Sequence, residues 1–227
     1  MNSEHVPAAE RLALLLSFNG GYVDTVGFIG LHGLFTAHVT GNFVTIGYAL
    51  VNGASGAWTK LAALPVFCIG VFCVRAYSLA RQAQGKPVFG HLLVIMTALL
   101  FLGAVLAVLL GPFADADDWG LLGTGMVLVA AMSVQNAAHR AHLGATPPST
   151  LMTGTTTQLM VDAADALRNT VDSERRRRMQ RMGRAIVFFA IGCAAAALLY
   201  VLAGTWSFAL PPVVSLVILV WSRYATE

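Results

Sequence analysis

The chain has 227 residues, of which 57% are hydrophobic and 11% are charged, and its formal net charge is +3. An average soluble domain is about 45–50% apolar and about 25% charged. Charged side chains in this number are too few to cover the surface of a water-soluble protein of this size. The composition therefore excludes an ordinary soluble protein and indicates that the bilayer is the solvent.

Six apolar segments are interpreted as membrane-spanning helices, each of which needs about 20 apolar residues. With turns placed at Gly, Pro and charged residues, the pattern predicts spans at 12–35, 60–80, 89–111, 119–140, 184–203 and 207–222. Two shorter apolar stretches, 41–52 and 154–168, each begin at a Thr-Gly pair. The polar residues before the first span lack the basic start of a cleaved signal, so we expect this span to be retained.

Basic residues set the expected topology, because cytoplasmic loops of membrane proteins carry an excess of Lys and Arg. The turn at 81–87 and the arginine-rich stretch 175–184 are then cytoplasmic, whereas the turn at 112–118 holds three Asp and no basic residue and is outside. We therefore expect both termini in the cytoplasm, and the arginines indicate topology rather than nucleic-acid binding.

If the turns alternate between inside and outside, residues 36–58 must enter and leave the membrane on the same side. The same holds for residues 141–183. Each would then contain a re-entrant element, with an extended limb followed by a half-helix. Non-helical backbone at that depth is tolerated only where protein buries it or where it lines an aqueous cavity. The alternative is that 41–52 and 154–168 are tilted full spans or interfacial helices.

The chain also matches itself in three places and in the same order, which indicates an internal repeat. Residues 40–42 return as 153–155, residues 21–25 line up with 133–137, and residues 67–70 line up with 189–192. An odd number of crossings in each half makes the repeats inverted, as in many secondary transporters. The predicted fold is an all-α integral membrane protein: one polytopic domain over 1–227, with about six transmembrane helices plus two half-helices, as inverted repeats at about 12–111 and 119–222.

Each Thr-Gly pair opens a predicted helix, and the N–H groups of a first helical turn are unpaired and carry a partial positive charge. Two such ends from opposite sides would form a polar site for an anion or a strongly polar neutral solute. The alternative is that the Thr hydroxyls only cap the helices.

Asp24 lies about halfway along the first span, where a charged side chain is costly and usually faces a cavity or a partner. It could carry a coupling proton or cation, or it could lock a neighbouring helix end; its repeat partner, Asn136, is uncharged. The candidate substrate-binding residues are Asp24, Asn19, Thr40, Gly41, Asn42, Gln135, Asn136, Thr153, Gly154 and Thr155.

Other polar residues give weaker signals. Asp162 and Asp165 either line a cytoplasmic approach or are neutralised by Arg140 or Arg168. The histidines are expected on the surface and the cysteines as packing residues; these are His32, His38, His139, His142, Cys68, Cys73 and Cys193. No metalloprotease, phosphate-loop, nucleophile-elbow or dinucleotide motif is present, so we expect no enzyme, no catalytic residue, no metal and no cofactor.

At the strings GYVD (21–24) and TGN (40–42), the chain resembles the YoaK-like family of bacterial integral membrane proteins, also described as domain of unknown function 1275. Residues 135–137 and 153–155 of the second half fit as well, so the resemblance extends from about 12 to 222. It implies a multi-pass protein of the bacterial inner membrane and brings no activity with it.

Two functions from different classes follow. The first is a small-solute transporter or permease with a central polar site, with or without proton coupling; the second is a non-transporting assembly or sensory protein. The expected partners are the lipid bilayer and a small polar solute, with a homo-oligomer left open and no nucleic acid. A polar cavity beside Asp24 would favour transport, and solid apolar packing there would weigh against it.

Overall fold

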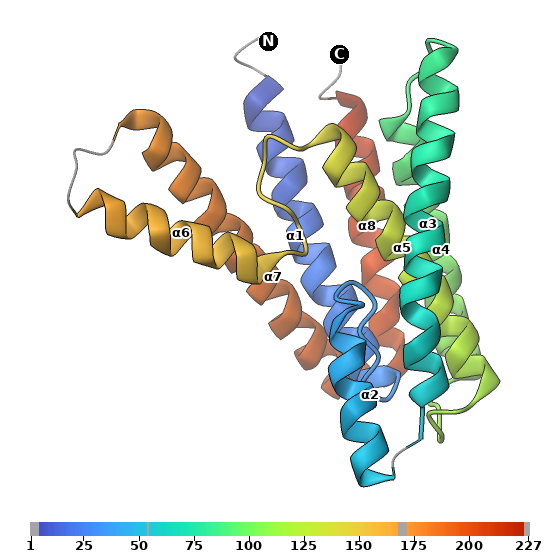
Figure 1. The fold of residues 1–227 in the computed structure, drawn as a ribbon. Helices are drawn as coiled ribbons and strands as arrows, with labels where there is room; N and C mark the ends of the chain where they lie inside the picture. Colours follow the sequence, from blue (N-terminus) through green and yellow to red (C-terminus); the bar gives the residue numbers. More distant parts are fainter. Residues whose placement is uncertain (1–4, 54, 168–171, 225–227) are drawn as a thin grey trace.

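The fold is all-helical, as predicted, and Figure 1 shows a computed structural model that describes residues 5–53, 55–167 and 172–224. The described residues contain no strand. The elements in chain order are α1 (His5–Gly30), α2 (Gly41–Asn52), α3 (Ala57–Ala83), α4 (Phe89–Leu110), α5 (Trp119–His142), α6 (Met152–Ala166), α7 (Ser173–Ala203), the 3₁₀ helix η1 (Gly204–Ala209) and α8 (Leu210–Tyr224).

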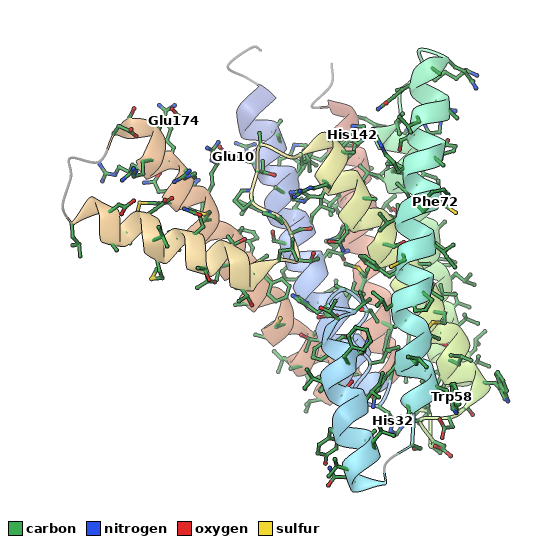
Figure 2. All side chains as sticks on the ribbon, in the orientation of Figure 1. Glu10, His32, Trp58, Phe72, His142 and Glu174 are labelled. Carbon is green, nitrogen blue, oxygen red and sulfur yellow. The ribbon has the colours of Figure 1, made fainter. Side chains whose placement is uncertain are left out.

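Five helical stretches of the described chain are long and apolar enough to cross a membrane, and the last, Ser173–Arg223, contains α7, η1 and α8. The chain turns inside this stretch at Gly204, whose φ is +55°, and α8 runs back alongside the bundle (Figure 1). Large apolar side chains point outward, as Phe72 does in Figure 2 with 75% of its surface exposed. An apolar outer surface of this kind is that of a multi-pass membrane protein.

Several span ends differ from the prediction, and two of them have a clear local cause. The first span ends at Gly30 rather than near residue 35, because His32 has a positive φ of 50° and the Gly33 N–H donates to the Phe28 carbonyl at 2.8 Å. This 6→1 bond is the usual end of a helix. The helix of the fifth span begins at Ser173 rather than 184, because the Asp172 carboxylate caps it by accepting from the Arg175 N–H at 2.6 Å.

Both termini and the α3–α4 turn lie at one end of the bundle, whereas the α4–α5 turn lies at the other (Figure 1). In Figure 2, Glu10, His142 and Glu174 mark the first end, and His32 and Trp58 mark the second. The basic turns and the acidic turn are therefore on opposite sides, as the sequence predicts.

Helix α1 packs against α7, and α5 packs against α3. At the first crossing a Cβ on Gly192 would lie 2.1 Å from the Phe18 carbonyl oxygen, so only glycine permits this approach. At the second, a Cβ on Gly70 would lie 2.1 Å from the Ser133 hydroxyl oxygen. The predicted repeat aligns Gly70 with Gly192, and each of these glycines packs against a helix from the other half of the chain. This equivalence supports the inverted repeat, which stays a prediction.

The two short helices begin inside the bundle and leave it in different directions (Figure 1). Helix α2 packs on α3, and α6 packs on α7. The alternative that the Thr side chains cap these helices is wrong: Thr40 is the N-cap of α2 but makes no side-chain cap bond, and the N-cap of α6 is Leu151. Each helix follows a non-helical limb, residues 31–40 before α2 and 143–151 before α6.

Candidate functional site

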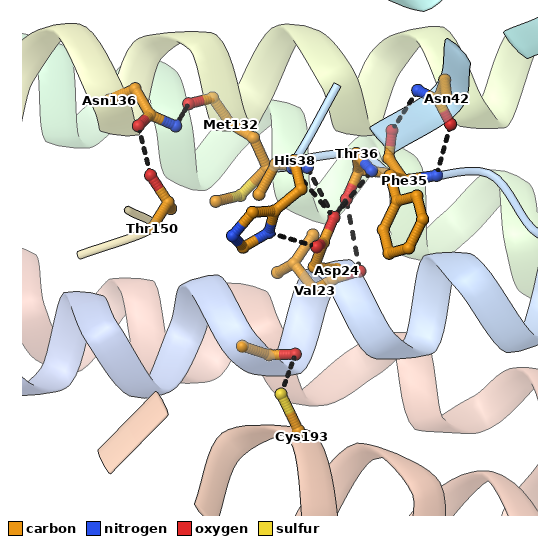
Figure 3. A network of polar contacts seen from close by, with 12 residues as sticks. Val23, Asp24, Phe35, Thr36, His38, Asn42, Met132, Asn136, Thr150 and Cys193 are labelled. Carbon is orange, nitrogen blue, oxygen red and sulfur yellow. Dashed lines mark hydrogen bonds and ion pairs between the residues drawn. The ribbon is translucent and has the colours of Figure 1, made fainter. Parts of the chain in front are cut away.

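Asp24 binds the backbone of the first limb (Figure 3). Its side chain lies in α1 and the residue is only 5% exposed. Its Oδ1 accepts the N–H groups of Thr36 at 2.8 Å, Ala37 at 2.7 Å and His38 at 3.3 Å. Successive N–H groups in such a concave turn bind anions. The carboxylate thus fixes the limb that leads into α2.

His38 uses the other oxygen of the same carboxylate. Its Nδ1 donates to Oδ2 of Asp24 at 2.6 Å, and its ring packs edge-on against Phe189 of α7, with 5.6 Å between ring centroids. The backbone of Thr150, in the second limb, lies near the ring. With 34% of its side chain exposed, His38 ties the first limb to α1 while keeping access to the space beside it.

Asn42 closes the first limb onto the start of α2. Its Oδ1 accepts the Phe35 N–H and its Nδ2 donates to the Phe35 carbonyl, both at 2.9 Å. Asn42 is 1% exposed, so these two backbone groups, rather than a solute, use its amide. This pairing sets the direction in which α2 leaves the limb.

Amide side chains hold the second limb to α5. The Asn136 Oδ1 accepts the Thr150 hydroxyl, and the Gln135 Nε2 donates to the Ser149 hydroxyl at 3.2 Å. Gln135 also accepts from the Asn19 Nδ2 of α1 at 2.9 Å. Asn136 thus holds its limb as Asp24 holds the first, with a neutral amide in place of the carboxylate.

An open cavity of about 560 Å³ lies beside the Asp24–His38 pair. Its lining residues come from α1, the first limb, the start of α2 and α7, and they are Asp24, Thr25, Phe28, Phe35, His38, Thr40, Gly41, Phe189 and Cys193. The volume lies within the range of about 300–1,000 Å³ that small-molecule sites occupy. Within the described parts of the chain, no cluster of His, Cys, Asp and Glu could hold a metal ion.

The family model described as protein of unknown function (DUF1275) matches residues 12–221, nearly the whole chain. The chain belongs to this family. The resemblance noted at the GYVD and TGN strings is thereby confirmed as DUF1275 membership. Comparisons with curated proteins and with solved structures give no match.

In this DUF1275 protein, the predicted site residues fall into separate groups. Asp24, Thr40 and Gly41 line the cavity beside His38, whereas Gly154 and Thr155 line a second cavity of about 350 Å³ near Arg178. Thr153 is exposed. The remaining predicted residues, Asn19, Asn42, Gln135 and Asn136, hydrogen-bond within the protein and line neither cavity. The limbs approach each other near His38 and Thr150, whereas Gly41 and Gly154 line separate cavities.

The histidine prediction is wrong at two positions. His38 binds Asp24, and His139 is 4% exposed inside the bundle, where its Nε2 meets the Thr146 hydroxyl at 3.1 Å. The aromatic walls of the cavity, Phe35 and Phe189, were also not predicted as site residues. A histidine two residues before a Thr-Gly pair is the one local feature that could have drawn attention to His38.

The contacts of Asp162 in α6 show that an arginine neutralises its carboxylate. It is 1% exposed, and the Arg178 Nε donates to its Oδ2 at 2.9 Å. Burial raises the pKa of Asp162, but the hydrogen bonds from Arg178 and Gln158 outweigh it, so this pKa lies below its usual value. The neutralising partner is thus Arg178 rather than Arg140; Arg168 lies outside the described residues.

Replacing Asp162 with Asn is expected to loosen α6 from α7. We expect a loss of about 1–2 kcal/mol in unfolding free energy, because Arg178 loses its carboxylate while water reaches the guanidinium, whose side chain is 49% exposed. Thermal unfolding of the purified protein measures the loss. Asp165→Asn is the control, because Asp165 is 54% exposed and lies 3.8 Å from Arg175, so it should change little.

The effect of Asp162→Asn should depend on pH in a defined direction. A carboxylate whose pKa is lowered by folding stabilises the protein above its unfolded pKa of about 3.9, and this contribution is lost as the pH falls through the folded pKa. The difference between wild type and variant should therefore close below about pH 4. A difference that stays constant down to pH 3 would contradict the ion pair.

Proposed function

We propose that this DUF1275 protein transports small solutes across the bacterial inner membrane, through the cavity beside Asp24 and His38. The observation that carries the proposal is a hydrogen-bonded pair of buried Asp24 and half-buried His38, at a point where the two non-helical limbs approach each other next to an open cavity. Ionisable residues at membrane depth mark substrate or proton pathways, and interrupted helices in secondary transporters place their binding sites in this way.

The two limbs are the parts that would move. Helices α2 and α6 lead from them in different directions, and each packs mainly against one spanning helix. A shift of one limb would therefore change access from one side without repacking the spanning bundle. Asp24 has the geometry of a lock for the first limb, because its Oδ1 is used by backbone N–H groups.

Proton coupling is assigned to the Asp24–His38 pair rather than to Asp24 alone. Histidine is the side chain whose charge changes between about pH 5 and 8. The titratable groups that face it are Asp24 from α1 and, across the cavity, Cys193 from α7. A proton taken up by His38 would alter its bond to Asp24, the residue that holds the first limb, which is what coupling requires.

The proposal needs no catalytic residue, metal or cofactor; its partners are the bilayer and the solute. Uptake into proteoliposomes under an imposed pH gradient tests it, with a panel of small anions, polar neutral solutes and aromatic solutes. Accumulation that requires both the protein and the gradient is expected for at least one class. If no class is taken up and none binds, the alternative of an assembly or sensory protein replaces transport.

Labelling of single cysteines tests the proposed orientation, with both termini in the cytoplasm. In a variant free of Cys68, Cys73 and Cys193, a membrane-impermeant maleimide applied to intact cells should label Ala114→Cys. It should not label Lys86→Cys or Arg177→Cys until the cells are opened. All three positions are exposed in the structure. External labelling at Arg177→Cys would overturn the orientation.

A further inference from the structure

The cavity beside Asp24 and His38 has aromatic walls. The rings of Phe28 and Phe35 pack against each other with 4.7 Å between centroids, and Phe189 faces the His38 ring from α7. All four residues line the cavity. Aromatic faces and edges in such arrangements favour an aromatic guest, because ring pairs gain energy beyond the area they bury.

The polar atoms in the same cavity are few, and most already have partners. The Asp24 oxygens are used by backbone N–H groups and by His38, and the Cys193 thiol donates to the Gly21 carbonyl at 3.4 Å. Among the described lining residues, the polar groups left for a guest are the outer edge of the His38 ring and the hydroxyls of Thr25 and Thr40. Small-molecule sites commonly combine a mainly apolar lining with a few such orienting groups.

Charge in the lining also restricts the guest. No Lys or Arg among the described residues lines the cavity, so the basic side chain that a small anion finds there is His38, which already pairs with Asp24. The Asp24 carboxylate is compensated by its N–H donors and His38, so it does not demand a cation. Transfer of an ion out of water without a compensating charge is strongly unfavourable. A neutral guest meets neither difficulty.

We propose that the cavity binds a small neutral aromatic solute of one or two rings that carries one hydrogen-bonding group. Its ring lies among Phe28, Phe35 and Phe189, and its polar group faces His38 and Thr40. This assignment rests on the proposed function, since it names the class of solute that the transporter carries. It replaces the anion or strongly polar solute that the sequence predicted.

Binding to the purified protein in nanodiscs tests the assignment, with phenol and indole as neutral aromatic probes. Cyclohexanol has a similar size without an aromatic ring, benzoate is an anion and benzylamine is a cation. We expect phenol and indole to raise the Tm in a saturable way, and the other three probes to have at least tenfold weaker effects. Weaker binding of indole than of cyclohexanol would overturn the assignment.

A pair of Phe→Leu variants distinguishes binding of the probe at this site from its partitioning into lipid. Phe189→Leu removes an aromatic wall while keeping an apolar side chain, and should weaken indole binding at least fivefold. Phe101→Leu is the matched control, because Phe101 lies on α4 in an apolar groove against α8 and does not line the cavity. Equal loss in both variants, or loss in neither, would overturn the assignment.

The two proposals fail in different ways. Uptake of benzoate or benzylamine, with indole neither bound nor carried, would overturn the aromatic assignment and leave transport in place. Saturable binding of indole that Phe189→Leu weakens, without uptake of any probe, would support the aromatic site and overturn transport. If no probe binds and none is taken up, both proposals fail.

Discussion

A single methyl group at Gly192 is expected to disrupt the contact between α1 and α7. A Cβ there would lie 2.1 Å from the Phe18 carbonyl oxygen and 3.0 Å from the Tyr22 nitrogen. Both are backbone atoms of α1, so no side-chain rotation relieves the overlap and one helix must move. Overpacking usually costs about 1–3 kcal/mol, and we expect Gly192→Ala to lie at or above the upper end. Chemical or thermal unfolding in detergent measures the loss.

Gly183→Ala is the matched control in the same helix. A Cβ at Gly183 meets no atom within 4 Å, and alanine in a helix interior is more stable than glycine by about 0.5–1 kcal/mol. The two alanine substitutions should therefore change stability in opposite directions. Equal stability of the two variants would mean that α1 and α7 do not approach so closely in the membrane.

The same contact bears on the candidate site. Across the crossing, a Cβ on Gly21 would lie 2.2 Å from the Phe189 carbonyl oxygen, and Gly21 is only three positions before Asp24 in α1. Phe189 forms one wall of the cavity. Separation of the helices would thus widen the cavity and move Phe189 away from His38, so Gly192→Ala should also weaken indole binding.

The spanning helices could be predicted from the sequence, whereas some of their ends could not. Hydropathy marks the part of a helix that lies in the bilayer, and it carries no signal for helical residues beyond the apolar segment. The arginine-rich start of α7 is helical because Asp172 caps it. The early end of α1 depends on the positive φ of His32, which a non-glycine residue rarely adopts and which a sequence pattern does not reveal.

For the site, the sequence identified Asp24 but not what it binds. A carboxylate at mid-span is rare enough to be noticed. Its main partners, however, are backbone N–H groups at 36–38, and any residue types could supply them. His38 was expected on the surface because no set of carboxylates or cysteines accompanies it in the sequence. Asn42 was expected to bind solute, and only the folded limb shows that the Phe35 backbone uses its amide.

Three substitutions at the Asp24–His38 pair are expected to distinguish two roles: the hold of Asp24 on the first limb and the proton coupling by the pair. Asp24→Leu leaves the buried N–H groups of the first limb without an acceptor, at about 1–3 kcal/mol each, so we expect little folded protein. Asp24→Asn keeps one oxygen for these donors and should fold, but its amide cannot accept from His38 in the position of Oδ2. His38→Gln keeps a donor toward Asp24 and removes the titrating ring. Size-exclusion profiles and Tm measure folding.

Uptake in proteoliposomes then measures coupling in the two variants that fold. Asp24→Asn and His38→Gln should both lose gradient-driven uptake. Exchange of solute without a gradient should persist in His38→Gln at a reduced rate, because the limb keeps its backbone bonds to Asp24 while the solute loses one orienting group. Among the described residues, no Lys or Arg lines the cavity, so none of them can take over the role of His38. Wild-type pH dependence in His38→Gln would remove His38 from the mechanism. Normal folding of Asp24→Leu would show instead that the first limb holds its shape without the carboxylate.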